Sequence, residues 1–271
     1  MIAPAKVNLM LHVAPPRADG LHPLCSLFAS IDLADEVRVE PAEADEVSCP
    51  GVEGPNLAVR ALAAYRDAAG AQAPPPLRVT IDKRIPVAAG LGGGSADAAA
   101  VLRALDERSP RPLGADALRA IGARLGADVP SQVEPRHALV TGAGEQIEPV
   151  GLPPMALVLV PQAEGLSTAA VYAEADRIGA TRPRLEPDAV RALAGAPLPD
   201  LAQALENDLQ AAALSLRPDL ERPLAQLRAA GAMAALVTGS GPTTFGVFAD
   251  AGAAQSAAAE VPGALLSRLR S

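Results

Sequence analysis

The sequence predicts a globular protein of mixed helices and strands that divides into two domains. Its 271 residues are enough for two cores, and 49% of them are hydrophobic, which excludes a disordered chain. Strand-like alternation at Leu77–Ile85 is followed by helical periodicity at 98–105. A boundary is expected near Gly151-Leu-Pro-Pro154, between domains at 1–150 and 151–271.

Further elements follow from the same periodicities. Val7–Val13 and Val37–Val39 have the pattern of strands, and Asn56–Ala69 has that of a helix. Val129 precedes Pro130, and because such a residue avoids helical geometry, a turn is expected there. The remaining expected elements are a helix at 118–125, a hairpin connection at 141–145, a buried strand at 155–160, proline-rich helices between 187 and 230, a strand at 234–237 and a second glycine loop at 238–246.

The most informative segment lies between the strand at Leu77–Ile85 and the helix after it. Four glycines between positions 90 and 94 precede Ser95. Glycine lets backbone N–H groups approach a ligand, and the positive end of the following helix favours an anion. A P-loop would need a lysine here, and the dinucleotide fingerprint would need a third glycine where Ser95 or Asp97 stands. The segment therefore predicts a phosphate cradle of another kind, with a flexible linker as the alternative.

Hydroxyl side chains accompany both glycine loops. Ser95 would serve as a Mg²⁺ ligand or as the cap of the helix that begins there, and the two interpretations are compatible. In the second loop Ser240, Thr243 and Thr244 would suit another phosphate contact, although a strand-to-helix turn would use the same residues.

Composition excludes several classes of protein. A net charge of -8 argues against a nucleic-acid partner, since such binding depends on neutralising phosphates. No apolar run approaches the length of a membrane helix, and Asn8 and His12 interrupt any signal-type segment. Cys25 and Cys49 lack metal-ligand spacing and are expected as reduced thiols that pack as small hydrophobic residues. A cytoplasmic protein, monomer or homodimer, is expected.

Lysine is scarce in this chain. Of the 23 basic residues only Lys6 and Lys83 are lysines, and the rest are arginines. An ammonium is a compact point charge suited to a phosphate oxygen, so the two retained lysines are candidates for anion binding, with a surface position as the alternative.

Lys6 and Asp128 would make a chemically sensible pair if the fold brings them together. A carboxylate can accept the proton of an attacking hydroxyl, and an ammonium keeps it ionised and offsets charge on a transferring phosphoryl group. Taken alone, an aspartate in the position of Asp128 is more often a turn or capping residue.

Aromatic residues are only 2% of the chain, so a planar base would find few stacking partners. Tyr172 is the best placed of them, although a half-buried tyrosine on an amphipathic helix is an equal explanation. His22 lies in a turn-rich segment where a core histidine is less expected.

Taken together, these motifs resemble those of the GHMP kinases. The superfamily pattern is carried by Ala3-Pro-Ala-Lys-Val-Asn-Leu9, Pro86–Ala100, Gly126–Pro130 and Gly239–Thr243. A narrower resemblance, to the kinases of 4-diphosphocytidyl-2-C-methyl-D-erythritol in the non-mevalonate isoprenoid pathway, is carried by Asp19-Gly-Leu-His22, Phe28–Asp32, Asp82–Pro86 and Glu206-Asn-Asp-Leu209.

This resemblance implies an α+β fold in two domains with the active site in the interdomain cleft. It implies ATP and Mg²⁺ as cofactors and phosphorylation of the 2-hydroxyl of a cytidine diphosphate-linked methylerythritol. Lys6 and Asp128 match the catalytic pair. The implied ATP site comprises Asn56, Lys83, Gly90, Leu91, Gly92, Gly93, Gly94 and Ser95, and the implied substrate site comprises Asn8, His22, Phe28, Thr168 and Tyr172.

Three departures from the pattern concern the substrate side. Leu21 stands where the family has a tyrosine that stacks on cytosine, Ala14-Pro-Pro-Arg17 replaces a glycine-arginine loop, and Ser131-Gln132 replaces hydrophobic and aromatic residues. Two other functions therefore stay open: a kinase of this superfamily for another small alcohol, of homoserine or mevalonate type, and a non-catalytic sensor of ATP and a metabolite.

Overall fold

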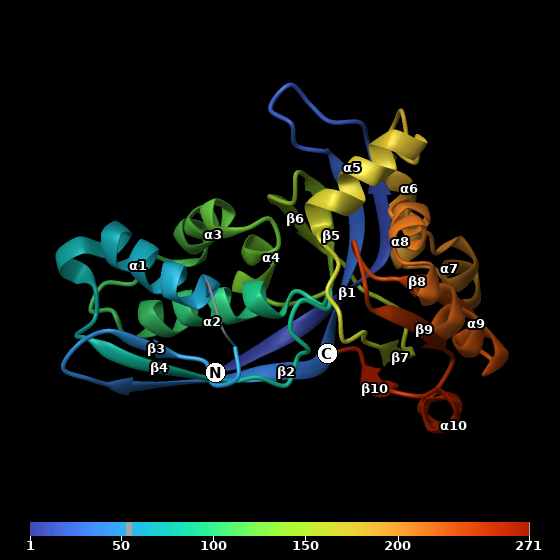
Figure 1. Cartoon of the computed structure of the whole chain (residues 1–271). Helices are drawn as coiled ribbons and strands as arrows, with labels where there is room; N and C mark the ends of the chain where they lie inside the picture. Colours follow the sequence, from blue (N-terminus) through green and yellow to red (C-terminus); the bar gives the residue numbers. More distant parts are fainter. Residues whose placement is uncertain (53–55, 271) are drawn as a thin grey trace. The chain divides into compact units, whose positions relative to one another are not determined.

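The computed structural model describes residues 1–52 and 56–270 (Figure 1). Its contacts divide the chain into two compact units that alternate along the sequence. Unit 1 comprises Met1–Ala5, Leu33–Val87 and Gly92–Arg136, and unit 2 comprises Lys6–Asp32, Ala88–Leu91 and His137–Ser271. Two long strands, β1 (Ile2–Val13) and β2 (Leu24–Pro41), pass from one unit into the other. The boundary expected near Gly151, between domains at 1–150 and 151–271, stays a prediction.

Unit 1 packs helices against a small sheet (Figure 1). Its elements are β3 (Glu46–Ser48), α1 (Leu57–Ala69), the 3₁₀ turn η1 (Gly70–Gln72), β4 (Leu77–Asp82), α2 (Gly93–Arg108), α3 (Ala115–Leu125) and α4 (Val129–Val133). β4 pairs antiparallel with β2 and parallel with β3. The alternation of Leu77, Val79 and Ile81 buries one face of β4 in the same core as the alanine-rich α2.

Unit 2 contains the rest of the chain. Its elements are β5 (Ala138–Gly142), β6 (Gln146–Pro149), β7 (Ala156–Val160), α5 (Thr168–Ile178), α6 (Pro187–Ala194), α7 (Leu198–Ala204), α8 (Gln210–Leu216), the 3₁₀ turn η2 (Pro218–Leu220), α9 (Glu221–Ala229), β8 (Ala234–Val237), β9 (Thr244–Phe248), α10 (Ala251–Glu260) and β10 (Leu265–Arg268). β5 and β6 extend β2 as an antiparallel meander, and a second sheet has the order β10-β7-β9-β8. α9 and α10 pack against this second sheet.

Most of the expected elements are confirmed. The helix expected at Asn56–Ala69 is α1, the hairpin connection at 141–145 joins β5 to β6, and the helices expected between 187 and 230 are α6 to α9. Cys25 and Cys49 are free thiols. Within the described residues, no helix is both long and apolar enough to span a membrane.

Two local expectations are wrong, and a third is confirmed only in part. The strand expected to reach Ile85 ends at Asp82, and the second glycine loop joins strands β8 and β9, so it is not a strand-to-helix turn. The turn expected at Gly126–Pro130 is present at Ala127 and Asp128, but it is shorter than expected, because Val129 is already helical and opens the short α4 although it precedes Pro130. Proline is tolerated in a first helical turn, and the side chain of Val129 packs closely on Gly122 of α3.

Candidate functional site

The loop before α2 has the backbone form expected of an anion cradle. Ala88, Gly90 and Gly92 have φ of 55°, 77° and 72°, and α2 begins at Gly93 directly after them. Alternating left-handed residues turn N–H groups toward one side, as in anion-binding nests. Gly92 takes the N-cap position and no side chain caps the helix, so the capping interpretation of Ser95 is wrong. Ser95 lies inside the first turn instead.

Gly90 has no room for a side chain. A Cβ atom there would lie 2.6 Å from the carbonyl oxygen of Gly241 and 3.2 Å from that of Thr238, both in the second glycine loop. The Thr243 N–H also donates to the Ala89 carbonyl (3.3 Å). The two glycine loops therefore meet at backbone distance within unit 2, which explains why glycine is required at this position.

Lys6 is 5% exposed and lies on β1 beside the second glycine loop. Its Nζ donates to Asn8 Oδ1 at 2.6 Å and lies 4.8 Å from the centre of the Phe28 ring. The Asn8 amide is oriented in turn, because its Nδ2 donates to Ser26 Oγ (2.9 Å) and its backbone N–H to Thr238 Oγ1 (2.9 Å). The structure thus brings together three of the residues predicted from the sequence, Lys6, Asn8 and Phe28.

A second group of predicted residues in unit 2 also comes together. The rings of His22 and Tyr172 are 4.9 Å apart and tilted by 51°. His22 Nδ1 donates to the Ala14 carbonyl (2.9 Å), and its Nε2 lies 3.4 Å from Asp176 Oδ2. Leu21 beside it is 53% exposed. This arrangement presents an aromatic pair with a polar edge, which suits a planar heterocycle.

Thr168 lies at the start of α5 and contacts the second glycine loop. Its hydroxyl is 3.0 Å from that of Ser240, so the two form a hydrogen bond. α5 itself begins because the Ser167 side chain accepts from the Ala170 N–H (3.4 Å). Among the described residues, the buried hydroxyls of Thr243 and Thr244 have no hydrogen-bond partner, whereas the Ser240 hydroxyl contacts Thr168, another side chain of the predicted site.

In unit 1, Lys83 is held between two buried carboxylates. Its Nζ donates to Asp35 Oδ2 and to Asp97 Oδ2, the latter at 2.8 Å. Asp35 Oδ1 accepts the backbone N–H groups of Arg84 (2.6 Å) and Ile85 (2.8 Å). Burial raises the pKa of Asp97 to about 6, against the opposing attraction of Lys83. Burial works against the charged form of Lys83 as well, but the two carboxylates raise its pKa.

Asn56 and Asp128 both stand at helix starts in unit 1. Asn56 caps α1, and its Oδ1 accepts the Ala58 N–H at 2.8 Å. Asp128 holds the N-cap position of α4 without capping it through its side chain, and its carbonyl accepts the Ser131 hydroxyl (2.8 Å). Lys6 belongs to unit 2, so its convergence with Asp128 stays a prediction.

Sequence reasoning missed several polar residues that support these groups. They are Ser26, which orients Asn8, Thr238, which accepts its N–H, and the carboxylates Asp35 and Asp97 on Lys83. Asp97 carried one signal, since it is a charged residue on the apolar side of a helix pattern. The others carried none, because each meets its partner through pairing of distant segments.

Two family models match the chain. The model of the GHMP kinases N terminal domain matches residues 56–134, and that of the GHMP kinases C terminal domain matches residues 189–266. The first match contains Asp128 and the glycine run at 90–94, called the glycine cradle below.

Curated relatives match over nearly the whole chain. The 4-diphosphocytidyl-2-C-methyl-D-erythritol kinase of Nocardia farcinica is 44% identical over 98% of this chain and 90% of its own length. The enzyme of the same name from Paracoccus denitrificans is 43% identical over 96% and 91%.

Solved structures agree with these relatives. A crystal structure of a 4-(cytidine 5'-diphospho)-2C-methyl-D-erythritol kinase has a TM-score of 0.83 and 36% identity, and the match covers 100% of this chain and 99% of that one. A homoserine kinase from Cytophaga hutchinsonii shares the fold, with a TM-score of 0.71 at 16% identity over 98% of this chain and 92% of its own. This chain therefore has the α+β GHMP fold and belongs to the GHMP kinases, within the family of the 4-diphosphocytidyl-2-C-methyl-D-erythritol kinases.

Proposed function

We propose that this kinase transfers the γ-phosphoryl group of ATP to the 2-hydroxyl of 4-diphosphocytidyl-2-C-methyl-D-erythritol. The observation that carries the proposal is the buried Lys6 ammonium, oriented by Asn8 beside the second glycine loop. A cation held in place without bulk water stabilises the charge that develops on a transferring phosphoryl group.

The first glycine loop is the proposed site of the ATP phosphates. The N–H groups of Gly90–Gly94 and the N-terminal end of α2 would bind them, and Asn56 and Lys83 would lie near the nucleotide. The negative trio of Lys83, Asp35 and Asp97 has a net charge of -1, so the backbone N–H groups rather than Lys83 would supply most of the attraction for phosphate.

Magnesium fits this site only together with ATP. Among the described residues no cluster of three or more histidine, cysteine or acidic side chains could hold a metal by itself. Mg²⁺ commonly binds through one or two protein oxygens and the substrate phosphates, and the partly exposed Ser95 hydroxyl in the first turn of α2 is of that kind. When bound, the ion would neutralise charge on the β- and γ-phosphates.

Asp128 and Lys6 are the proposed catalytic pair. The Asp128 carboxylate would accept the proton of the substrate 2-hydroxyl as that oxygen attacks the γ-phosphorus and the bond to the β-phosphate oxygen breaks. The Lys6 ammonium would keep the carboxylate ionised. A positioned base contributes about 10²–10⁴-fold in rate, which is about 3–5 kcal/mol of barrier.

The cytidine end of the substrate would lie at His22 and Tyr172. Tyr172 would stack on the cytosine beside His22, while Asn8, Phe28 and Thr168 would line the methylerythritol end. Leu21 offers an aliphatic surface where a second aromatic ring would otherwise complete the stack, so binding is expected to be weaker by about 1–3 kcal/mol.

The remaining expectations concern partners and location. We infer a small-molecule substrate and no nucleic-acid partner from the net charge of -8. The free thiols Cys25 and Cys49 support a cytoplasmic enzyme. Its expected oligomeric state is a monomer or a homodimer.

A coupled assay of ADP release tests this function. The purified chain would be given ATP, Mg²⁺ and, in separate reactions, 4-diphosphocytidyl-2-C-methyl-D-erythritol, homoserine and mevalonate. We expect turnover with the first alcohol and background rates with the other two. Turnover only with homoserine or mevalonate would overturn the substrate assignment, and no turnover with any of them despite ATP binding would support the sensor hypothesis.

A further inference from the structure

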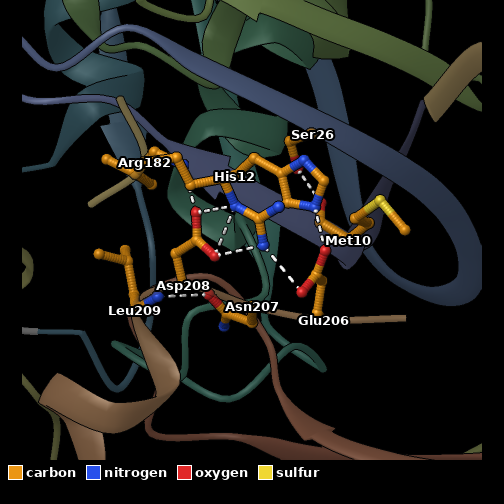
Figure 2. Close-up of polar contacts among 9 residues, drawn as sticks. Met10, His12, Ser26, Arg182, Glu206, Asn207, Asp208 and Leu209 are labelled. Carbon is orange, nitrogen blue, oxygen red and sulfur yellow. Dashed lines mark hydrogen bonds and ion pairs between the residues drawn. The ribbon is translucent and has the colours of Figure 1, made fainter. Parts of the chain in front are cut away.

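The segment Glu206–Leu209 has no role in the function proposed above, yet it is tied closely to the strand that carries Lys6. It lies between α7 and α8 and pairs with β1 through one parallel bridge, Leu11 to Asn207. The Leu11 N–H donates to the Glu206 carbonyl (3.0 Å), and the Asp208 N–H donates to the Leu11 carbonyl (2.9 Å). Figure 2 shows the side chains of this segment together with His12 and Arg182.

Charged groups on one side of the bridge hold the segment in register. Asp208 accepts Arg182 Nε and Nη2, both at 2.7 Å, and also the Val13 N–H at 2.9 Å. Arg182 also reaches Glu206 (2.8 Å), whose other carboxylate oxygen lies 2.9 Å from His12 Nε2 (Figure 2). Charge-assisted hydrogen bonds of this kind are the stronger ones in proteins, so the backbone at position 207 is firmly placed.

Asn207 holds the second glycine loop through the NH2 group of its side-chain amide. Its Nδ2 donates to the carbonyls of Val237 and Gly239, both at 2.8 Å, and its Oδ1 accepts the Leu209 N–H at 2.9 Å. The residue is 8% exposed. Both N–H donors of the amide are therefore committed to two carbonyls that flank the start of the loop.

The loop that Asn207 holds is packed against Lys6 and Asn8. Gly239 has φ of 58°, and a Cβ atom there would lie 3.1 Å from Asn8 Oδ1 and 3.7 Å from Lys6 Nζ. The preceding residue, Thr238, accepts the Asn8 N–H. A shift of the Gly239 peptide would therefore change the packing around the Lys6 ammonium.

We propose that Asn207 is a positioning residue for phosphoryl transfer, which fixes the second glycine loop against Lys6 and Asn8. The expected fall in kcat rests on the proposed function, whereas the placement of the second glycine loop by Asn207 does not. A misplacement of about 1 Å at a reacting centre can cost about 10²-fold in rate. Loss of the two bonds from Asn207 should therefore lower kcat and leave the Michaelis constants nearly unchanged.

A graded series of variants tests the proposal. Asn207 offers two donors, Asn207→Ser keeps at most one and Asn207→Ala keeps none, so kcat should fall in that order, by about 10- to 100-fold for the alanine variant. Gln210→Ala is the matched control, since Gln210 Oε1 accepts the Val237 N–H (2.9 Å), a backbone group at the same strand end that precedes the loop at 238–246. We expect its kcat to stay near the wild-type value.

Hydrogen exchange of the 238–243 peptide supplies a readout that needs no substrate. Exchange should be faster in Asn207→Ala than in the wild type and unchanged in Gln210→Ala. Equal exchange in the two variants, or an equal fall in kcat at matched thermal stability, would overturn the proposal. If Asn207→Ala does not fold, the same comparison is made with Asn207→Ser. A wild-type enzyme without kinase activity would refute the proposed function alone, and the exchange result would still decide the role of Asn207.

Discussion

The two lysines of the chain lie in different units and in different chemical surroundings. Lys83 in unit 1 bridges two buried carboxylates, whereas Lys6 in unit 2 donates to an amide oxygen and lies over an aromatic ring. The charge of Lys83 is offset within its own trio, and its removal would leave Asp35 and Asp97 buried together. The two lysines are therefore kept for different reasons: Lys83 stabilises the fold, and Lys6 serves the chemistry proposed above.

The largest expected effect is on turnover at the Lys6 side of this comparison. Lys6→Ala and Asp128→Asn should each lower kcat by about 10²–10⁴-fold, because each removes one half of the proposed catalytic pair. The coupled assay measures the loss, and ATP binding followed by calorimetry serves as the control. Normal activity in either variant would remove that residue from the mechanism.

At Lys83 the main expected effect is on stability and not on turnover. Lys83→Met should destabilise the protein by about 3–5 kcal/mol, because breaking a buried ion pair leaves uncompensated charge behind. Urea denaturation measures the change. Adding Asp97→Asn to this variant should restore part of the stability, since one of the two stranded carboxylates is then neutral. If Lys83→Met were as stable as the wild type, the structural role given to Lys83 would fail.

The pH dependence of stability sharpens the same contrast. Burial raises the pKa of Asp97 to about 6, above the value near 4 of an unfolded aspartate, so the folded state binds the proton more tightly between these limits. The stability that this tighter proton binding contributes is therefore present at low pH and is lost as the pH rises to about 6. We expect the wild type to lose up to about 3 kcal/mol relative to Asp97→Asn over this range.

The control for the pH experiment is a variant in unit 2, whereas Asp97 and Lys83 belong to unit 1. Urea denaturation of the wild type, Asp97→Asn and Leu21→Ala from pH 4 to pH 7 separates the titration of Asp97 from that of other groups, including His12, whose pKa is lowered mainly by burial. A difference between the wild type and Asp97→Asn that does not vary with pH would show that Asp97 keeps an ordinary pKa.

The smallest expected effect is at the cytidine end of the site in unit 2. Leu21→Tyr should lower the Michaelis constant for the cytidine substrate, with a gain of about 1–3 kcal/mol, because a second ring would complete the stack beside His22 and Tyr172. The Michaelis constant for ATP should not change. Leu21→Ala is the matched control, and an unchanged or higher constant for Leu21→Tyr would contradict the role given to this position.

Local pattern was enough to predict much of the fold. The helical periodicity after Asn56, the alternation in β4 and the glycine run before α2 each involve residues close in sequence, and each is found in the structure. Val129 was misassigned because its packing on Gly122 of α3 outweighs the local preference of a residue before proline. Lys6, Asn8 and Phe28 could be predicted as a group only through the family resemblance, since strand pairing brings them together.

The sequence by itself determined the family, the glycine cradle and the choice of Lys6 and Lys83 as unusual cations, because composition and short motifs carry that information directly. Only the tertiary structure decided what each lysine contacts and which residue holds the second glycine loop. Asp35 meets Lys83 across 48 positions, and Asn207 meets Gly239 across 32. Contacts of that kind depend on how strands and loops pair in space, and the burial that shifts the pKa of Asp97 exists only once they have done so.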